Sequence, residues 1–176
     1  MTDVRPLAAD LVPAVTAFFA RVPESDHSSF AEDVLAPGLV QSWLEDTRGR
    51  RFVAVDGDDV VGYLAVLPLV GWSAHVGSVR LVVDPARRGQ GIGRALARHG
   101  LLTGLGLGLD KLVVEVVADA EPAIAMFEKL GYQPEALLHD HVRDKAGRTR
   151  DLVVLAHAVD DTWSGMATAG IEDDLT

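Results

Sequence analysis

The sequence predicts a mixed α/β (α+β) fold, in which helices cover the faces of a central sheet. The length of 176 residues suits one domain with a sizeable hydrophobic core. Apolar residues make up 48% and charged residues 24%, which is ordinary for a globular protein. Along the chain, strand-like and helix-like apolar patterns follow the order β, α, α, then three strands, α, β, α, β, β.

The first half of the chain predicts a short strand, two helices and a β-hairpin. Pro13 falls in the first turns of the first helix, where proline is tolerated, whereas Pro37 and Gly38 should break the second helix in two. Asp56-Gly57-Asp58-Asp59 is typical of a hairpin turn. The expected elements are residues 4–7 (strand), 8–20 (helix), 21–29 (loop), 30–46 (helix), 51–55 and 60–67 (strands).

The second half predicts four strands and two helices. Asp84-Pro85 should end one strand, Pro122 can begin the last helix, and Gly131 can cap its C-terminus. The expected strands are residues 75–83, 111–117, 132–138 and 151–158, and the expected helices run to residue 103 and from residue 122. We expect residues 1–159 to form a single domain and residues 160–176 to form a loosely held acidic tail.

Composition argues against several classes of partner. The net charge of −10 does not suit a nucleic-acid surface, which needs a basic stripe. It is compatible with a cationic acceptor, although solubility is the commoner reason for such a charge. The apolar residues 101–109 are too few to cross a membrane, and the N-terminus does not have the pattern of a signal peptide. We therefore expect a cytoplasmic protein without nucleic-acid or membrane partners.

The chain contains no cysteine, which excludes disulfides, thiolate zinc sites and a cysteine nucleophile. His139 and His141 are spaced to lie on one side of a strand, but no third ligand accompanies them. We therefore predict no metal site.

A glycine-rich turn between a strand and a helix is the most informative feature. It reads Arg88-Gly89-Gln90-Gly91-Ile92-Gly93. Glycines let a ligand approach the backbone, and the free amides of a helix N-terminus form an anion site suited to a pyrophosphate. The turn lacks the lysine of a Walker loop, and the third glycine of G-x-G-x-x-G is replaced by Arg94 or Leu96. A nucleotide-binding domain of another class is therefore disfavoured.

The turn matches [RQ]-x-x-G-x-[GA] at Arg88, Gly91 and Gly93, and residues 112–116 and 123–132 match the patterns L-x-x-E-V and A-I-x-x-[YF]-E-K-x-G-[FY]. Over residues 50–158 the chain resembles the GNAT superfamily of N-acetyltransferases, while the first 50 residues agree in layout only. The resemblance implies a mostly antiparallel sheet that is splayed at the cofactor site. It also implies acetyl-CoA as co-substrate and an amine acceptor, and it allows a homodimer.

The resemblance assigns three groups of residues to the cofactor. The strand backbone at Leu81, Val82 and Val83 would pair with the pantetheine arm, and the Val83 amide would be the oxyanion donor. The turn would hold the pyrophosphate through Arg88, Gly89, Gln90, Gly91, Ile92, Gly93 and Arg94, although Arg94 fits a solvated helix position equally well. Phe127 stands where many relatives have a tyrosine acid, and Ala120 where many have an asparagine. Phe127 would pack beside the cofactor, so the leaving thiolate would take its proton from water.

Glu115 is the candidate catalytic base, because it is a lone carboxylate in an apolar strand and such a group needs a partner or a function. The alternative is that Glu115 only hydrogen-bonds within the sheet. Asp26, Tyr63 and His75 are candidate acceptor-side residues that also fit structural roles. The sequence leaves the acceptor open, and a non-catalytic acyl-CoA-binding module remains the alternative to an enzyme.

Overall fold

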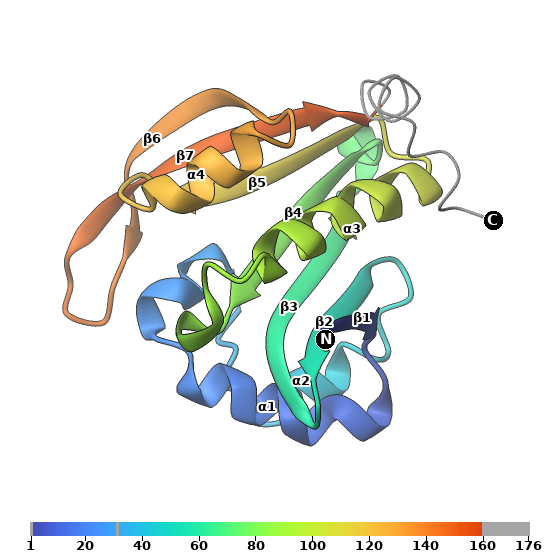
Figure 1. Ribbon diagram of the computed structural model, residues 1–176. Coiled ribbons are helices and arrows are strands. Elements are labelled where there is room, and N and C mark those ends of the chain that lie inside the picture. Colours follow the sequence, from blue (N-terminus) through green and yellow to red (C-terminus); the bar gives the residue numbers. More distant parts are fainter. Residues whose placement is uncertain (1, 31, 160–176) are drawn as a thin grey trace.

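The computed structural model describes residues 2–30 and 32–159, which include a seven-stranded mixed sheet in the order β1-β2-β3-β4-β5-β7-β6 (Figure 1). The strands are β1 (Asp3–Pro6), β2 (Arg50–Asp56), β3 (Asp59–Pro68), β4 (Val76–Val83), β5 (Lys111–Val117), β6 (Gln133–Arg143) and β7 (Thr149–Ala158). Only β4 and β5 pair in parallel, and the other neighbours are antiparallel. The predicted fold class is confirmed, while the predicted tail at residues 160–176 lies outside the described residues.

Four α-helices and short 3-10 segments connect these strands. The helices are α1 (Val12–Arg21), α2 (Leu39–Ser42), α3 (Ile92–Gly106) and α4 (Glu121–Glu128), and the 3-10 segments are η1 (Ala9–Leu11), η2 (Glu24–Ser29), η3 (Gly71–Ser73) and η4 (Pro85–Arg87). Pro13 lies in the first turn of α1, as predicted. Pro122 occupies the same kind of position in α4.

The predicted helix over residues 30–46 is wrong. Among residues 30 and 32–46, which the structure describes, only the four residues of α2 are α-helical, and Gly38 precedes them with a left-handed φ of 79°. Pro37 and Gly38 were expected to divide a helix, but they prevent most of it from forming, because neither residue supports a continuous helix. The predicted loop at residues 21–29 instead contains η2.

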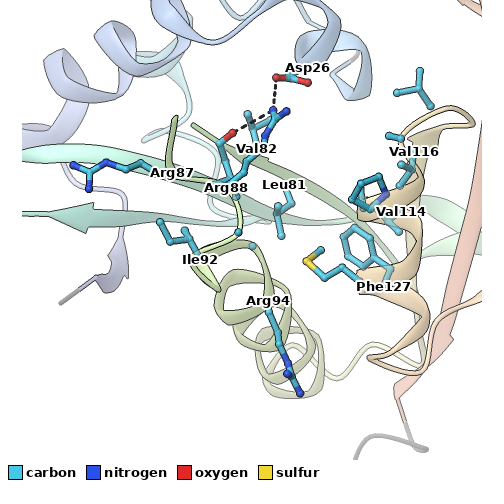
Figure 2. Close-up of a pocket in the computed structure, with 18 of the residues that line it drawn as sticks. Asp26, Leu81, Val82, Arg87, Arg88, Ile92, Arg94, Val114, Val116 and Phe127 are labelled. Carbon is cyan, nitrogen blue, oxygen red and sulfur yellow. Dashed lines mark hydrogen bonds and ion pairs between the residues drawn. The ribbon is translucent and has the colours of Figure 1, made fainter. Parts of the chain in front are cut away.

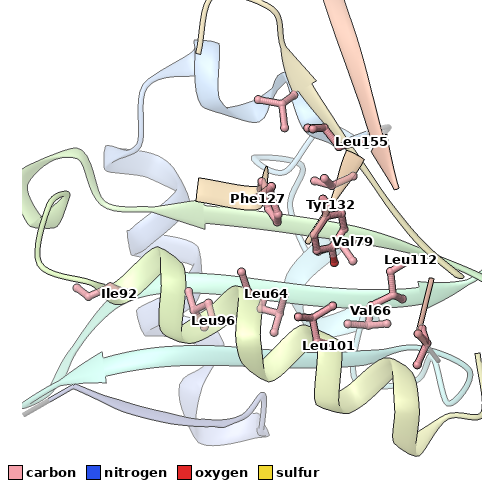
Figure 3. Close-up of a cluster of buried hydrophobic side chains, with 14 of the residues drawn as sticks. Leu64, Val66, Val79, Ile92, Leu96, Leu101, Leu112, Phe127, Tyr132 and Leu155 are labelled. Carbon is pink, nitrogen blue, oxygen red and sulfur yellow. The ribbon is translucent and has the colours of Figure 1, made fainter. Parts of the chain in front are cut away.

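The two faces of the sheet carry separate hydrophobic cores. On one face, Leu96 and Leu101 of α3 pack with Leu64 of β3 and Leu112 of β5 (Figure 3). On the other face, Phe18 and Phe19 of α1 pack beneath the strands with Trp43 and Tyr63, among other residues. Because helices lie against both faces, the central strands are fixed and their edges are positioned for the site described below.

The sheet opens where its two parallel strands separate. The pairing of β4 with β5 runs from Val76 with Lys111 to Val79 with Val114 and then stops. Beyond these pairs the two strands continue to Val83 and Val117. This is the splayed arrangement that the resemblance implied.

An ion pair links α1 to the strand that precedes the glycine turn. Arg21 Nε donates to Asp84 Oδ2 at 2.8 Å, and the Ala86 amide donates to Asp84 Oδ1 at 2.9 Å. The Arg21 hydrogen bond is the main reason that the pKa of Asp84 lies below its usual value of 3.8. A depressed folded-state pKa means that this stabilisation is present above the unfolded-state pKa and is lost as the pH falls through the folded-state pKa.

We therefore expect Asp84→Asn to lower the free energy of unfolding at pH 7 by about 1–3 kcal/mol. The difference from the native chain should shrink as the pH falls below the usual aspartate value of 3.8 and through the lowered folded-state pKa of Asp84, because this carboxylate becomes protonated over that range. Urea unfolding followed by circular dichroism at pH 7 and pH 3 measures both values. Glu135→Gln, which removes an exposed pair with Lys111, should cost less than about 1 kcal/mol. If Asp84→Asn lowered the free energy of unfolding equally at both pH values, the charge of Asp84 would not be the source of the stabilisation.

None of the helices in the described part of the chain is long and apolar enough to cross a membrane.

Candidate active site

A pocket of about 540 Å³ occupies the opening between β4 and β5; we call it the central pocket (Figure 2). Its walls come from the ends of β4 and β5, the glycine turn, the start of α3, α4 and η2. The lining residues are Ser25, Asp26, Leu81, Val82, Val83, Arg87, Arg88, Gly89, Gly91, Ile92, Gly93, Arg94, Val114, Glu115, Val116, Val117, Ala120, Pro122, Ala123, Met126 and Phe127.

The open edge of β4 presents unpaired backbone groups to the central pocket. The Asp84 amide donates to the Val61 carbonyl of β3 at 3.0 Å. Because successive peptide groups of a strand face opposite edges, those of Leu81 and Val83 face away from β3. The β5 ladder has already ended at Val79, so the backbone groups of Leu81 and the Val83 amide are available to an extended ligand, while the Val83 carbonyl is contacted by Arg88 Nη2 at 3.4 Å.

The glycine turn gives a ligand access to the backbone. Gly89 and Gly91 have left-handed φ values of 77° and 84°, and a Cβ added at either would meet no atom within 4 Å. A Cβ added at Gly93 would lie 3.2 Å from Met126 Sδ of α4. Glycine is therefore favoured at the first two positions by conformation, and at the third a side chain would require Met126 to shift by a few tenths of an ångström.

The first amides of α3 point out of the helix without intrahelical acceptors. The earliest helical bond is the one from the Ala95 amide to the Gly91 carbonyl, at 3.0 Å. The amides of Ile92, Gly93 and Arg94 precede it and therefore lack a partner four residues back. With the positive end of the helix dipole, they form an anion-binding position at the rim of the pocket.

The arginines around this rim have different partners. Arg88 Nη2 contacts Asp26 Oδ2 of η2 at 2.5 Å and the Val83 carbonyl at 3.4 Å (Figure 2). Arg87 pairs with Asp56 at 3.0 Å. The side chain of Arg94 is exposed and points away from the Asp26–Arg88 pair. Arg88 therefore connects η2 to the glycine turn.

The wall opposite the glycine turn is apolar. Phe127 is 3% exposed, and its ring lies 5.1 Å from that of Tyr132 in an edge-to-face contact. Ala120, Pro122 and Met126 complete this wall. Since the burial of Tyr132 raises the pKa of its phenol, that residue stays neutral behind Phe127.

Glu115 lies at the point where β4 and β5 separate. Its Oε2 is 3.5 Å from Arg80 Nη1, and the side chains of Glu115 and Arg80 are 36% and 16% exposed. The sequence left open whether Glu115 has a partner or a function. It has a partner, and it also lines the central pocket, where it is accessible to a substrate.

The structure brings most of the predicted residues together. Lining the central pocket are Asp26, Leu81, Val82, Val83, Arg88, Gly89, Gly91, Ile92, Gly93, Arg94, Glu115 and Phe127. Gln90 is exposed in the same turn but is outside that lining.

Two predicted acceptor-side residues lie elsewhere. Tyr63 is 1% exposed and lines a second, smaller cavity, where burial raises the pKa of its phenol. His75 is exposed immediately before β4, at the opposite end of that strand from Val83. His75 is therefore outside the lining of the central pocket.

Sequence reasoning missed several residues of the site. Arg87 lines the central pocket because η4 approaches it, a tertiary feature with no local signal, whereas Ser25 lies in the segment 24–30 that the resemblance implied would line the acceptor cleft. Arg80 had a signal, since it stands in an apolar strand just as Glu115 does. The described residues contain no group of three or more histidine, aspartate or glutamate side chains able to hold a metal ion.

An acyl-coenzyme A ligand fits these features of the central pocket. The open β4 edge suits the amide-containing pantetheine arm, which can pair like an added strand. The unfilled space over Gly89 and Gly91 beside the α3 amides suits the pyrophosphate. Residues that would contact the ligand are thus Leu81, Val83 and the backbone from Gly89 to Arg94.

Comparison with known proteins agrees with this geometry. The model of the acetyltransferase (GNAT) family matches residues 14–132. Streptothricin acetyltransferase of Streptomyces lavendulae is 36% identical over 89 residues, which cover 50% of this chain and 47% of that protein. Mycothiol acetyltransferase of Kocuria rhizophila is 35% identical over 120 residues, which cover 65% of this chain and 39% of that protein. The matches thus span less than half of these relatives' lengths.

Solved structures share the fold at low identity. The ribosomal-protein-S18-alanine N-acetyltransferase from Escherichia coli has a TM-score of 0.70 and 20% identity, covering 90% of this chain and 94% of that one. The ribosomal-protein-alanine N-acetyltransferase from Brucella melitensis has a TM-score of 0.77 and 21% identity, covering 89% and 99%. The fold, the glycine turn and the family match together show that this chain belongs to the GNAT family of acetyltransferases.

Proposed function

We propose that this protein transfers the acetyl group of acetyl-CoA directly to the primary amine of an acceptor. The observation that carries the proposal is the separation of β4 from β5 beside the glycine turn. This arrangement offers an extended backbone edge and an anion site within one pocket. The two features match the two parts of coenzyme A, the pantetheine arm and the pyrophosphate.

Glu115 is the proposed general base. An amine is mostly protonated at neutral pH, so a carboxylate at the pocket wall can accept the ammonium proton, directly or through water. The Val83 amide, on the open edge of β4, is the proposed hydrogen-bond donor for the oxyanion. Phe127 cannot donate a proton, so the leaving thiolate takes its proton from water.

The acceptor enters from the side of the sheet that carries η2. Glu115 and Arg80 face that side, and η2 contributes Ser25 and Asp26 to the central pocket. The tip of the β6–β7 hairpin reaches the same segment, since the Lys145 amide donates to Glu24 Oε1 at 3.0 Å. The names of the relatives mention different compounds, streptothricin and mycothiol, so they do not select an acceptor for this chain.

The test is ligand binding followed by turnover. In a thermal shift assay, acetyl-CoA and coenzyme A should raise the melting temperature by mass action, while ATP and NAD should not. Release of free coenzyme A is then measured with a panel of primary amines. Stabilisation by ATP or NAD without stabilisation by coenzyme A would overturn the proposal.

A second candidate function is a non-catalytic acyl-CoA-binding module. It is favoured by Phe127 and Ala120, which stand where many relatives have a tyrosine and an asparagine. This candidate predicts stabilisation by both coenzyme A species but no coenzyme A release with any amine.

A further inference from the structure

A second cavity of about 160 Å³ lies beside the central pocket; we call it the side cavity. It is lined by Phe30, Glu32, Trp43, Arg51, Tyr63, Ala65, Leu67 and Arg80. Arg80 joins the two spaces, because it lines the side cavity while its guanidinium pairs with Glu115 of the central pocket. An acceptor held in the side cavity therefore lies next to the proposed base.

The register of the sheet forms the floor of the side cavity. Arg51 of β2 pairs with Ala65 of β3, and Ala65 pairs with Arg80 of β4. Directly opposed residues share a face of the sheet, so the small Ala65 separates two arginines across neighbouring strands. Glu115 of β5 continues the row beyond Arg80. Across this face of the sheet, a cation (Arg51), a small residue (Ala65), a second cation (Arg80) and a carboxylate (Glu115) therefore follow one another.

The side chain of Arg51 is buried, that of Arg80 is partly buried, and each has N–H donors beyond those in its ion pair. The side chain of Arg51 is 8% exposed and pairs with Asp46 at 2.9 Å, yet its buried Nε has no hydrogen-bond partner among the described residues. The side chain of Arg80 is 16% exposed, and its Nη1 lies 3.5 Å from Glu115 Oε2. A guanidinium has five N–H donors, and leaving them unsatisfied in a buried position is costly.

Aromatic rings form the walls above this floor. Trp43 is 5% exposed, its ring centroid lies 5.2 Å from that of Tyr63, and the Arg51 guanidinium carbon lies 5.5 Å from the Trp43 ring. Glu32 also lines the side cavity and accepts a hydrogen bond from Trp43 Nε1 at 3.2 Å, so a ligand anion is attracted by hydrogen bonds from the arginines and not by a net positive charge of the lining. A small group with two acceptor oxygens satisfies such donors best, and a carboxylate matches the guanidinium fork.

We infer that the acceptor carries a carboxylate as well as its amine, and that Arg80, with Arg51 behind it, binds this carboxylate in the side cavity. The inference rests on the proposed acetyl transfer and narrows its substrate class to amino acids and similar amino-carboxylates. Binding the carboxylate at Arg80 orients the amine toward Glu115 and the central pocket. Arg80 is therefore a specificity-determining residue.

The test compares acceptors that differ only in the carboxylate. The probes are the standard amino acids, their amides and their decarboxylated amines, with coenzyme A release as the readout. We expect kcat/KM to be about 10–100-fold higher for the best amino acid than for its amide, as charged hydrogen bonds of this kind contribute. Equal rates for an acid and its amide would overturn the inference while leaving acetyl transfer intact.

An Arg80→Gln variant separates carboxylate binding from any effect of Arg80 on Glu115. Loss of carboxylate binding should abolish the preference for the acid over the amide, whereas an effect through Glu115 alone would slow both acceptors by the same factor. Arg80→Lys keeps the positive charge but lacks the paired N–H donors of a guanidinium, so it should retain part of the preference for the amino acid over its amide. Lys111→Gln, which removes a cation at the other end of β5, is the control and should keep all of it.

Binding without turnover provides an independent check. Calorimetric titration of the amino acids into the protein saturated with coenzyme A should show binding that Arg80→Gln weakens. If amino acids bind in this way but none is acetylated, the proposed acetyl transfer fails while the carboxylate site stands. If no amino acid binds or reacts, although other amines are acetylated, the carboxylate site is wrong.

Discussion

A Gly91→Trp variant should lose its stabilisation by acetyl-CoA while remaining folded. The added Cβ has open space around it, so the side chain clashes with no protein atom at its base, but it enters the space assigned to the pyrophosphate. The native chain should gain about 2.7 kcal/mol at a hundredfold excess of ligand over Kd. For a chain of this size, that gain corresponds to roughly 5–10 °C in melting temperature. In the variant this gain should vanish.

The matched control is Gly108→Trp, two residues beyond the C-terminal end of the same helix. Gly108 has a φ of 68°, is exposed, and likewise has no atom within 4 Å of an added Cβ. Forcing a side chain into left-handed backbone should cost roughly 1–2 kcal/mol at either glycine. Both variants should therefore melt earlier by similar amounts, but only Gly91→Trp should lose the acetyl-CoA response. Full stabilisation of Gly91→Trp would mean that the turn does not hold the ligand.

Local sequence patterns predicted those parts of the site that are formed by a single continuous segment of the chain. The glycine turn follows from the conformations that Gly89, Gly91 and Gly93 permit, and the structure gives the first two positive φ values. Glu115 was identified because a charge in an apolar strand is costly. Each of the seven strands of the sheet overlaps a predicted strand, because the apolar patterns of strands are local.

Features that depend on register and tertiary packing were not predicted. The helix expected over residues 30–46 failed because a helical apolar pattern does not overcome Pro37 and the left-handed Gly38. The row of Arg51, Ala65 and Arg80 exists only through the pairing of three strands, which no local pattern specifies. Tyr63 pairs with Val82 of the central pocket, but its side chain is buried against Phe19 and Trp43, and His75 stands at the opposite end of β4 from Val83. Neither position follows from a local pattern.

A Glu115→Gln variant should lower kcat by about 10²–10⁴-fold, which is the usual contribution of a positioned general base. Its stabilisation by acetyl-CoA should be unchanged, because the pyrophosphate and pantetheine positions lie on the glycine turn and β4. Coenzyme A release at saturating acceptor measures the rate, and the thermal shift measures cofactor binding. The control is Glu135→Gln, which removes the carboxylate of the pair between Lys111 of β5 and β6, and which should leave kcat unchanged.

The pH profile distinguishes a base from a structural partner of Arg80. Without a base, the reaction depends on amine that is already neutral, and this fraction rises about tenfold per pH unit below the amine pKa. The difference in kcat between the native chain and Glu115→Gln should therefore shrink steadily as the pH rises toward the pKa of the amine. If Glu115 only positions Arg80, its removal impairs acceptor binding by a similar factor at every pH. A rate difference that stays constant with pH, together with a raised KM for the acceptor, would mean that Glu115 positions Arg80 in the side cavity and does not transfer a proton.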